Sequence, residues 1–576
     1  MSHGNIVVLK FGSSVLRSET DLPRAVHEIY RHWRSGNHVV AVASALGNTT
    51  NRLLRLANDV SHEPAHPAVA ALVSSGETTS SALLTLALDR AGIPAKLLDP
   101  AQAGLRTVGN ESDSEPVSLD VARLRKELEQ SVVVLPGFAG RNDQGDTTLL
   151  GRGGSDLSAI FVAQQLGAHC ILLKDVDGLY TSDPANSERA LLRFRGAKYE
   201  TALHVGGSLV QSKAVQYAAK HCVRFEISAI SAGTGTEIGA DADIVENPKS
   251  QPRRLRVALL GCGTVGGGVY ERLAALPEFF EVVGVAVRNI SRERVPCVPK
   301  HLLSNKPNQL INAEYDVLVE LIGGTNHASA LIEHALHLGR HVVTANKALI
   351  ARAGEHLRAL AEANDVTIRA GAAVGGALPA LELIDQARSN GPISGLGGVL
   401  NGTTNFIIDQ LAHGEELEHA IEAAQRAGYA EADPTLDLNG TDSAQKLIML
   451  ARAAFGISLP FEKIARQGVE HLDASALMES GRRGSTIRLV ATCRWNGAGL
   501  HASVAPVEVP ISSPFGQLRG AQNGLLVETN NGWGRVVRGI GAGRWPTTEA
   551  VMADLLALHC ELAAHSTEEQ LEEFVA

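Results

Sequence analysis

The chain has 576 residues, of which 44% are hydrophobic and 20% are charged, as is typical of globular α/β proteins. This length suffices for roughly three or four domains with separate cores. The formal net charge of -10 argues against a nucleic-acid partner, and no apolar run approaches the ~18 residues that a membrane span needs. We therefore expect small-molecule substrates.

The six cysteines show no C-x-x-C pair and no zinc-ligand spacing. The N-terminus enters an apolar strand directly and lacks the pattern of a secretion signal. These observations predict a cytoplasmic protein without a disulfide framework or a structural metal.

From residue 5 to about 240, short apolar strands alternate with helical stretches. This alternation predicts a mostly parallel sheet with helices on its faces, and ligands gather at the strand ends of such sheets. The candidate strands are Ile6–Leu9, His38–Ala43, Val132–Leu135, Cys170–Leu173 and Arg224–Ile227.

Three polar segments follow candidate strands or precede helices in this half. Lys10-Phe-Gly-Ser-Ser14 offers a cation, amides and hydroxyls to a polyphosphate, or is simply a solvated lysine before a turn. Ser44–Thr50 follows the second strand. Ser74–Thr78 precedes an apolar helix, where Glu77 is either a ligand or an acid in the first helical turn.

The most specific segment of this half is Gly145–Asp156. Arg152 stands between glycines, so its guanidinium is free to bind a carboxylate or phosphate. Ser155 and Asp156 stand at a helix start, where a plain N-cap is the alternative. Lys174–Pro184 follows another strand as a polar loop suited to a nucleotide.

These segments resemble the catalytic domain of aspartate kinases, in the amino-acid kinase superfamily, over residues 5 to about 240. The resemblance implies an amino-acid kinase fold that uses ATP with Mg²⁺ to phosphorylate aspartate, with Lys10 stabilising the transferring phosphoryl group. It also implies an aspartate site and a nucleotide site. The aspartate site would comprise Thr49, Glu77, Arg152, Ser155 and Asp156, and the ATP and Mg²⁺ site Asp175, Asp177, Tyr180 and Asp183.

Two departures from the kinase pattern bear on activity. The Lys10–Val15 segment is one residue shorter than the family signature, and Ser208 stands where a nucleotide-contacting lysine is expected. Lys213 either substitutes for that lysine or is a solvated helix residue. Residues 241–253 read as a linker, which leaves no room for the ACT regulatory domains that follow aspartate kinases, so we expect no ACT-type feedback control.

Near the middle of the chain, a buried strand, Val257–Leu260, runs into a G-x-G-x-x-G turn formed by Gly261, Gly263 and Gly266. Such a turn lets a pyrophosphate approach the start of the next helix, here Gly267–Leu276, although it also occurs without a ligand. The following strand, Val282–Val287, ends at Arg288 rather than at an acid. Arg288 therefore favours NADP over NAD, unless it is only a surface arginine.

Further polar segments follow in Glu320–Thr325, His341–Lys347, Val374–Pro379 and Gly397–Asn405. Lys347 comes immediately after a buried strand and is either solvated or able to reach the cofactor crevice. In the segment from Gly428 to Lys446, acids at 431, 433 and 437 lie in an expected irregular loop. Asp442 and Lys446 stand one turn apart on one face of an apolar helix, so we expect this pair to face a site rather than form a surface salt bridge.

These motifs resemble homoserine dehydrogenases from residue 254 to the end of the chain. The resemblance implies a Rossmann domain over 254–384 and 539–576, an α+β substrate and dimerisation domain over 385–538, and a homo-oligomer. It assigns proton transfer to Lys446 and the orientation of Lys446 to Asp442. Lys347 would contact the substrate or assist proton transfer, and Glu431 and Asp437 would bind the α-ammonium group. The expected cofactor contacts are Gly261, Gly263, Thr264, Val265, Gly266, Arg288 and Thr344.

Together the two resemblances predict a bifunctional enzyme acting on aspartate, and on aspartate semialdehyde and homoserine. The alternative is a dehydrogenase whose kinase-like half is catalytically weak and serves assembly or regulation. A glutamate kinase fused to a glutamyl-phosphate reductase is disfavoured, because no cysteine has the setting of that reductase's nucleophile. Gly371 replaces an acid associated with a sodium site, so we expect weak dependence on monovalent cations.

Overall fold

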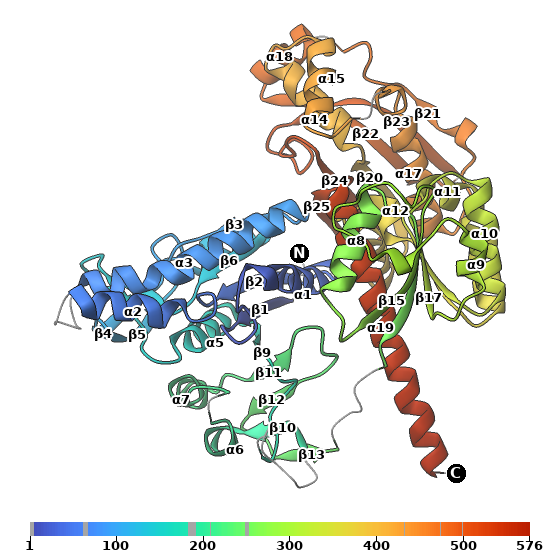
Figure 1. The fold of residues 1–576 in the computed structure, drawn as a ribbon. Coiled ribbons are helices and arrows are strands. Elements are labelled where there is room, and N and C mark those ends of the chain that lie inside the picture. The colour runs from blue at the N-terminus through green and yellow to red at the C-terminus, as the bar shows by residue number, and fades with distance from the viewer. Residues whose placement is uncertain are drawn as a thin grey trace. The chain divides into compact units, whose positions relative to one another are not determined.

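The computed structural model describes residues 5–60, 67–182, 192–207, 209–247, 253–430, 433–472, 474–497 and 499–575, with side chains in the last helix described as far as residue 562. The chain forms two compact units that divide near residue 252 (Figure 1). None of the described helices is long and apolar enough to cross a lipid bilayer.

The first unit is built on a nine-stranded sheet. The five strands expected from the sequence form its parallel centre, where β1 lies between β9 and β2. The strand order is β13 (Ile244–Glu246), β10 (Arg193–Lys198), β12 (Thr236–Gly239), β11 (Phe225–Ala229), β9 (His169–Lys174), β1 (Ile6–Phe11), β2 (His38–Ala43), β6 (Val132–Pro136) and β3 (Ala95–Leu97).

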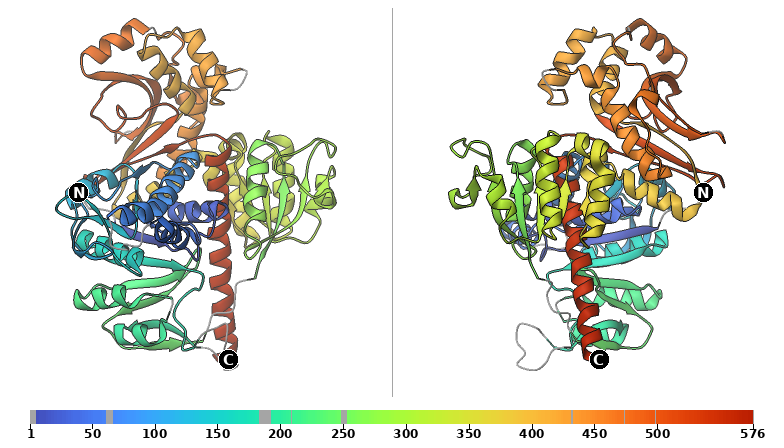
Figure 2. Two further views of the ribbon diagram at one scale, coloured as in Figure 1. Left: turned by 60° about the vertical axis from the view of Figure 1, so that its left-hand side comes forward. Right: turned by 90° about the vertical axis from the view of Figure 1, so that its right-hand side faces the viewer.

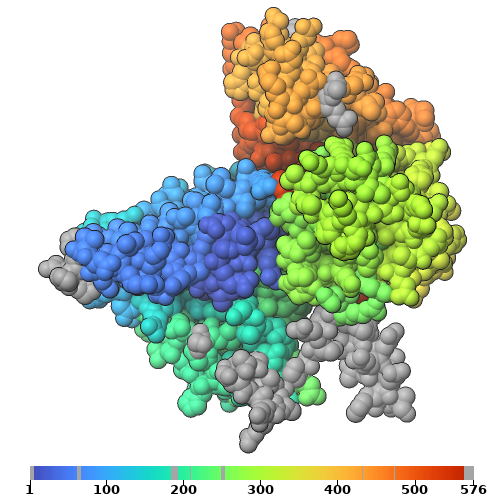
Figure 3. Space-filling view, viewed as in Figure 1, coloured from blue at the N-terminus to red at the C-terminus, as the bar shows by residue number. Residues whose placement is uncertain are grey.

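Helices cover the sheet, and α5 packs against β1, β2 and β9. The helices are α1 (Leu22–Arg34), α2 (Thr49–Val60), α3 (Pro67–Arg90), α4 (Val121–Leu128), α5 (Gly154–Leu166), α6 (Tyr199–Val205) and α7 (Ser212–Lys220). A smaller sheet has the order β5 (Asp113–Ser118), β4 (Arg106–Asn110), β7 (Ala139–Arg141) and β8 (Thr147–Leu149). Helices α2 and α3 lie at the surface of this unit (Figure 3).

Part of the expected linker over residues 241–253 belongs to this sheet. Residues Ile244–Glu246 form β13, which pairs antiparallel with β10 at the sheet edge. The sequence did not predict this strand because three residues are too few to show strand periodicity.

The second unit begins with a six-stranded parallel sheet. Its order is β16 (Leu303–Ser304), β15 (Phe280–Ala286), β14 (Leu255–Leu260), β17 (Val317–Glu320), β18 (His341–Thr344) and β19 (Ile368–Arg369). The strand order reverses at β14, which is the ligand-binding switch point of a Rossmann fold. The fold predicted for this segment is confirmed.

Helices cover this sheet on both faces. They are α8 (Thr264–Ala274), α9 (Pro307–Ile311), α10 (Asn326–His337), α11 (Lys347–Ala363) and α12 (Gly371–Gly375), and α19 (Arg544–Val575) packs against α8 (Figure 2). Helix α8 begins at Thr264, three residues before the expected Gly267, because Gly266 and Gly267 are themselves helical.

The remainder of the second unit packs helices on a sheet that is largely antiparallel. The strand order is β21 (Ala465–Arg466), β23 (Leu500–Pro510), β22 (Ser485–Trp495), β20 (Ile393–Val399), β24 (Gln522–Thr529) and β25 (Gly534–Ile540). The helices are α13 (Ala380–Asn390), α14 (Gly402–Ala412), α15 (Leu417–Arg426), α16 (Thr435–Leu438), α17 (Thr441–Phe455) and α18 (Ala474–Arg482).

Helix α17 holds this part of the second unit together. Its Leu447 and Leu450 are buried in one core with Leu396 of β20 and Leu525 of β24. After β25 the chain returns to the Rossmann sheet, and the amide of Ala377 donates to the carbonyl of Ile540 at 3.1 Å. The helix that follows, α19, packs against α8 and β18.

Candidate active sites

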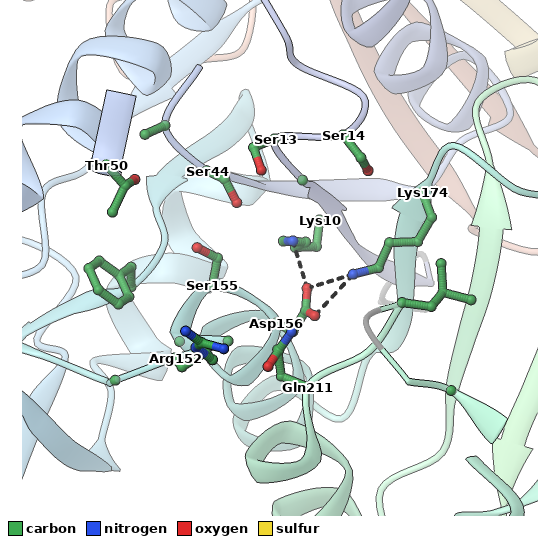
Figure 4. A pocket seen from close by; sticks show the side chains of 18 of the residues that line it. Lys10, Ser13, Ser14, Ser44, Thr50, Arg152, Ser155, Asp156, Lys174 and Gln211 are labelled. Atoms are coloured by element: carbon green, nitrogen blue, oxygen red, sulfur yellow. Dashed lines mark hydrogen bonds and ion pairs between the residues drawn. The ribbon is translucent and has the colours of Figure 1, made fainter. Parts of the chain in front are cut away.

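A cavity of about 890 Å³ opens in the first unit at the carboxyl ends of β1, β2 and β9. This is the edge at which parallel α/β sheets bind ligands. The walls of the cavity carry many polar side chains, and most of these lie on segments that the sequence singled out (Figure 4). They include Lys10, Ser13, Ser14, Ser44, Glu77, Arg152, Ser155, Asp156, Lys174, Asp175 and Tyr180.

Asp156 stands between two lysines in this cavity. Its carboxylate lies 2.6 Å from the ammonium of Lys10 and 3.0 Å from that of Lys174 (Figure 4). All three residues are buried. Burial raises the pKa of the Asp156 carboxyl, but the two ammonium groups outweigh it and hold that pKa at about 2. The carboxylate is therefore ionised at neutral pH, and this trio carries a net charge of +1.

Glu77 lies in the middle of α3, so the alternative of a first-turn helix acid is wrong. The side chain is 2% exposed, lines the cavity, and its Oε2 atom lacks a hydrogen-bond partner among the described residues. Burial raises the pKa of the Glu77 carboxyl to about 7, against smaller lowering effects of backbone hydrogen bonds at Glu77 and Ala45 and of Lys10. Glu77 therefore titrates in the physiological range.

Arg152 lines the cavity between two glycines with positive φ, Gly151 and Gly153. A Cβ on Gly153 would lie 2.2 Å from the Cβ of Gln211, so a side chain there would displace α7. Gly153 is the N-cap of α5, and Ser155 and Asp156 lie inside its first turn. The alternative reading of these two residues as simple N-caps is therefore wrong.

Two of the expected kinase residues, Thr49 and Asp177, do not line the cavity, and two further positions lie outside the described residues. Thr50 rather than Thr49 lines the cavity, and the Thr49 side chain lies against Gly76 of α3. Asp177 is also absent from the cavity wall and accepts a hydrogen bond from the Tyr180 hydroxyl at 2.6 Å. Asp183, and Ser208 at the expected lysine position, lie outside the described residues.

Lys213 lies on α7, outside the cavity wall, and is bound to neighbouring groups. Its ammonium lies 2.5 Å from the Asp113 carboxylate and donates to the carbonyls of Ser114 and Leu150 at 3.1 and 2.8 Å. These bonds tie α7 to the small sheet beside the Arg152 loop. Lys213 is thus partly exposed, held by these bonds, and not part of the cavity wall.

In the second unit, the glycine turn forms a cradle at the start of α8. A Cβ on Gly261 would lie 2.7 Å from the Leu321 carbonyl oxygen, and one on Gly266 would lie 2.2 Å from that of Gly261. The space in front of Gly263 is open, and this N-cap residue provides no side-chain cap. The first amides of α8, from Thr264 and Val265 onward, are therefore free to bind a pyrophosphate.

The other two expected cofactor residues differ in their surroundings. Arg288 is exposed beyond the end of β15 and forms no ion pair with any described residue. Thr344 is fully buried, and its hydroxyl donates to the Glu320 carboxylate at 2.6 Å. The Thr344 side chain therefore joins the ends of β18 and β17, a contact that its position at a strand end did not reveal.

The Asp442 and Lys446 pair on α17 is buried, as expected from the apolar helix, and its groups lie 3.0 Å apart. Asp442 also lies 2.5 Å from the ammonium of Lys347, at the start of α11. Burial raises the pKa of the Asp442 carboxyl, but Lys446 and Lys347 outweigh this effect and hold that pKa well below the usual range. Burial, assisted by Lys347, lowers the pKa of Lys446, while Asp442 opposes that shift.

The junction between β20 and α14 holds these groups in place. The Leu400 carbonyl accepts hydrogen bonds from Lys446 at 2.6 Å and from the Asn523 amide at 3.0 Å. The Asn401 amide nitrogen donates to Asp437 at 2.6 Å and to Asp442 at 2.9 Å. Its oxygen accepts from the Thr404 amide at 2.8 Å and caps α14.

Asp437 lies on the one-turn helix α16, not in the irregular loop expected from the sequence. Burial and the neighbouring Asp442 raise the pKa of its carboxyl, against a lowering by the Asn401 hydrogen bond. The exposed Asp433 bonds only to Thr435 among the described residues. Glu431 lies outside the described residues.

Sequence reasoning placed Lys174 and Asn401 in candidate ligand segments but assigned neither of them a role of its own. Lys174 had a signal, because two strands that proved to be neighbours, β1 and β9, each carry a lysine at the carboxyl end. Asn401 had a weaker one as the polar residue between a buried strand and a helix. Among the described residues, no group of three His, Cys, Asp or Glu side chains could hold a metal ion.

The two folds and sites define a two-part enzyme, with an amino-acid-kinase-type domain ahead of a dehydrogenase that has a Rossmann cofactor site. Three family models match: the amino acid kinase family over residues 5–228, the homoserine dehydrogenase NAD-binding domain over 261–370, and homoserine dehydrogenase over 379–556. The chain belongs to the homoserine dehydrogenase family and carries an amino acid kinase domain.

Several relatives cover the second half of the chain. A homoserine dehydrogenase from Synechocystis sp. is 34% identical over 315 residues, which cover 52% of this chain and 72% of that protein. One from Pseudomonas aeruginosa is 35% identical over 314 residues, covering 52% and 71%. The crystal structure of a homoserine dehydrogenase from Thiobacillus denitrificans matches with a TM-score of 0.50 and 34% identity, covering 54% of this chain and 75% of that one.

Proposed function

We propose that the second unit interconverts aspartate 4-semialdehyde and L-homoserine with NADP as the preferred cofactor. The observation that carries this proposal is the buried Lys446, whose ammonium is held by the Leu400 carbonyl and by Asp442. An ammonium group has three N–H donors. These two contacts leave a third N–H to bind the substrate oxygen.

Lys446 then acts as the general acid and base at the C4 oxygen of the substrate. During reduction its ammonium gives a proton to the aldehyde oxygen as C4 becomes an alcohol carbon, and in the reverse direction the neutral amine takes that proton back. The lowered pKa of Lys446 brings the two protonation states closer in free energy. Asp442 positions Lys446, Lys347 contacts the substrate, and Asp437 and Glu431 bind its α-ammonium group.

The glycine turn fits a nicotinamide dinucleotide, because added side chains would fill its cradle at Gly261 and Gly266. The bound cofactor supplies or accepts the hydride. We assign the 2′-phosphate of NADP to Arg288, which is exposed and free of ion pairs among the described residues. Arg288→Ala should raise the KM for NADPH about tenfold or more, leave that for NADH unchanged, and thus test the preference.

We propose that the first unit transfers the γ-phosphoryl group of ATP to the β-carboxylate of L-aspartate. The carboxylate oxygen forms the new bond to phosphorus while the bond to the ADP oxygen breaks. Lys10 and Arg152 supply positive charge around the transferring group, and Glu77 binds the α-ammonium group of aspartate. Asp175 and Tyr180 line the cavity and would hold the nucleotide and its Mg²⁺.

A second candidate is a kinase-like unit with little turnover. It is favoured by the position of Lys213, which is held by Asp113 outside the cavity wall and so does not replace the lysine expected at residue 208. Aspartate-dependent ADP release, assayed with and without Mg²⁺, separates the two candidates. Turnover that Arg152→Ala abolishes supports the kinase, and no turnover in the wild-type protein supports the second candidate.

A further inference from the structure

In the cavity of the first unit, the buried cluster of Lys10, Asp156 and Lys174 holds one more cation than its carboxylate neutralises. The other buried carboxyl of this cavity, Glu77, is only partly ionised at neutral pH, because burial raises its pKa to about 7. Lys10, Lys174 and Asp156 are 5%, 8% and 4% exposed, and both ammonium groups contact the same carboxylate. A buried charge without a counter-ion is costly, so such a site favours an anionic ligand. Both lysines line the cavity.

The two ammonium groups reach this point from adjacent parallel strands. Lys10 lies on β1 and Lys174 is the last residue of β9, while Asp156 approaches from the first turn of α5. In Figure 4 the lysines approach the two carboxylate oxygens from different sides. Asp156 thus fixes two cations at a spacing set by one carboxyl group, which suits the oxygens of a phosphate chain.

We propose that Lys174 is a catalytic residue of the kinase reaction, binding the phosphate chain of ATP together with Lys10 and stabilising the charge that develops as the γ-phosphoryl group is transferred. This inference rests on the proposed kinase function. It also supplies the second cation that Lys213 does not provide, since Lys213 is bound to Asp113 outside the cavity wall. Asp156 is then a positioning residue for both lysines.

The charge on Lys174 gives the proposal a pH signature. Burial and, to a smaller extent, the nearby Lys10 lower the pKa of Lys174 to about 8, against the opposing effect of Asp156 and Asp175. The groups that face it are therefore Lys10 on β1, Asp156 on α5 and Asp175 at the end of its own strand. As the pH rises through about 8, Lys174 loses its proton and the affinity for ATP should fall.

The test compares Lys174→Met, Lys174→Arg and a control, Lys126→Met, which replaces an exposed lysine of α4 outside the cavity wall. Aspartate-dependent ADP release and Mg–ATP binding by calorimetry are measured from pH 6.5 to 9.5, and thermal unfolding of each variant serves as the folding control. We expect Lys174→Met to weaken Mg–ATP binding at least tenfold and lower kcat at least a hundredfold. In Lys174→Arg the alkaline fall in kcat/KM for ATP should move up by more than one pH unit.

The proposal is overturned if Lys174→Met binds Mg–ATP and turns over like the control, or if the alkaline fall persists unchanged in Lys174→Arg. If the wild-type protein binds Mg–ATP but releases no ADP, the kinase function fails and binding alone decides the role of Lys174. Weaker binding by Lys174→Met then upholds its phosphate contact and overturns its catalytic part. A wild-type protein that neither binds nor hydrolyses ATP contradicts both proposals.

Discussion

The ammonium group of Lys446 lies 3.0 Å from the carboxylate of Asp442, one turn away on the same helix. An i,i+4 pair on a helix surface adds only a few tenths of a kcal/mol. Here both residues are more than 90% buried, so the charge of each group shifts the pKa of the other. The pair therefore controls when Lys446 can give a proton.

We predict that Asp442→Asn lowers kcat for aldehyde reduction about 10- to 100-fold, because Lys446 loses its buried counter-charge. The pKa of Lys446 should fall further once Asp442 no longer opposes the effect of burial. The alkaline limb of the kcat profile should then move to lower pH. NADPH oxidation with aspartate semialdehyde, followed across pH, measures this shift, and Asp433→Asn is the exposed control. An unshifted limb would contradict the coupling.

Asn401 offers a way to separate positioning from folding. In Asn401→Ser the hydroxyl should still cap α14 at Thr404, whereas both hydrogen bonds to Asp437 and Asp442 are lost. We predict a drop in dehydrogenase kcat/KM of about 10- to 100-fold. The unfolding free energy should change by less than about 1 kcal/mol, whereas Asn401→Ala should also lose the cap.

A pH profile distinguishes this role from a merely structural one. The Asn401 hydrogen bond lowers the pKa of Asp437, so its loss should raise that pKa further. When the pH is lowered, the KM for homoserine should therefore begin to rise at a higher pH in Asn401→Ser than in the wild-type enzyme. An Asn401→Ser enzyme with the wild-type acid limb would show that Asn401 only supports the fold.

Glu77 should make the kinase depend on pH near neutrality. Its pKa of about 7 means that the carboxylate that binds the aspartate ammonium is lost as the pH falls below this value. We predict that the KM for aspartate rises between pH 8 and pH 6 in the wild-type protein. Glu77→Gln should have a high KM at every pH, and an equally steep dependence in that variant would contradict the assignment.

The same shift predicts an effect on stability. Because the folded pKa of Glu77 lies above the ordinary value of 4.5, the stabilisation is fully present below pH 4.5 and is lost as the pH rises through 7. The loss amounts to about 3 kcal/mol. Glu77→Gln should therefore gain stability relative to the wild type between pH 5 and pH 8 in thermal unfolding, and a pH-independent difference would argue against the raised pKa.

The glycine turn allows a matched pair of substitutions. In Gly266→Ala the new methyl group would lie 2.2 Å from the Gly261 carbonyl oxygen, whereas in Gly263→Ala it would meet no atom within 4 Å. We predict that Gly266→Ala destabilises the second unit and loses the cofactor. Gly263→Ala should fold normally but bind NADPH at least tenfold more weakly, because its methyl group occupies the pyrophosphate space. Fluorescence titration with NADPH checks both variants. If both bound NADPH as tightly as the wild-type protein, the glycine turn would not be the pyrophosphate site.

The sequence predicted the parts of the fold that follow from local pattern. The five central strands of the first sheet and the βαβ unit around Gly261 have clear apolar runs and turn residues, and both are present. The edge strand β13 and the one-turn helix α16 were missed because they are too short to show a period.

The site residues divide in a similar way. Lys446 and Asp442 are four residues apart on one helix, so their pairing could be read from spacing alone. The contacts of Lys174 with Asp156, and of Asn401 with Asp437, join segments distant in sequence and depend on tertiary packing. The sequence showed Thr344 at a strand end but could not show that its hydroxyl is bound by Glu320.

The central claim is that one chain carries two separate activities. The most direct measurement assays one purified protein for homoserine-dependent NADP⁺ reduction and for aspartate-dependent ADP release, alongside Lys446→Met and Arg152→Ala. Both activities should be present in the wild type. Lys446→Met should lose the first about 10²- to 10⁴-fold, and Arg152→Ala should lose only the second. Dehydrogenase activity without any ADP release from the wild-type protein would contradict the claim.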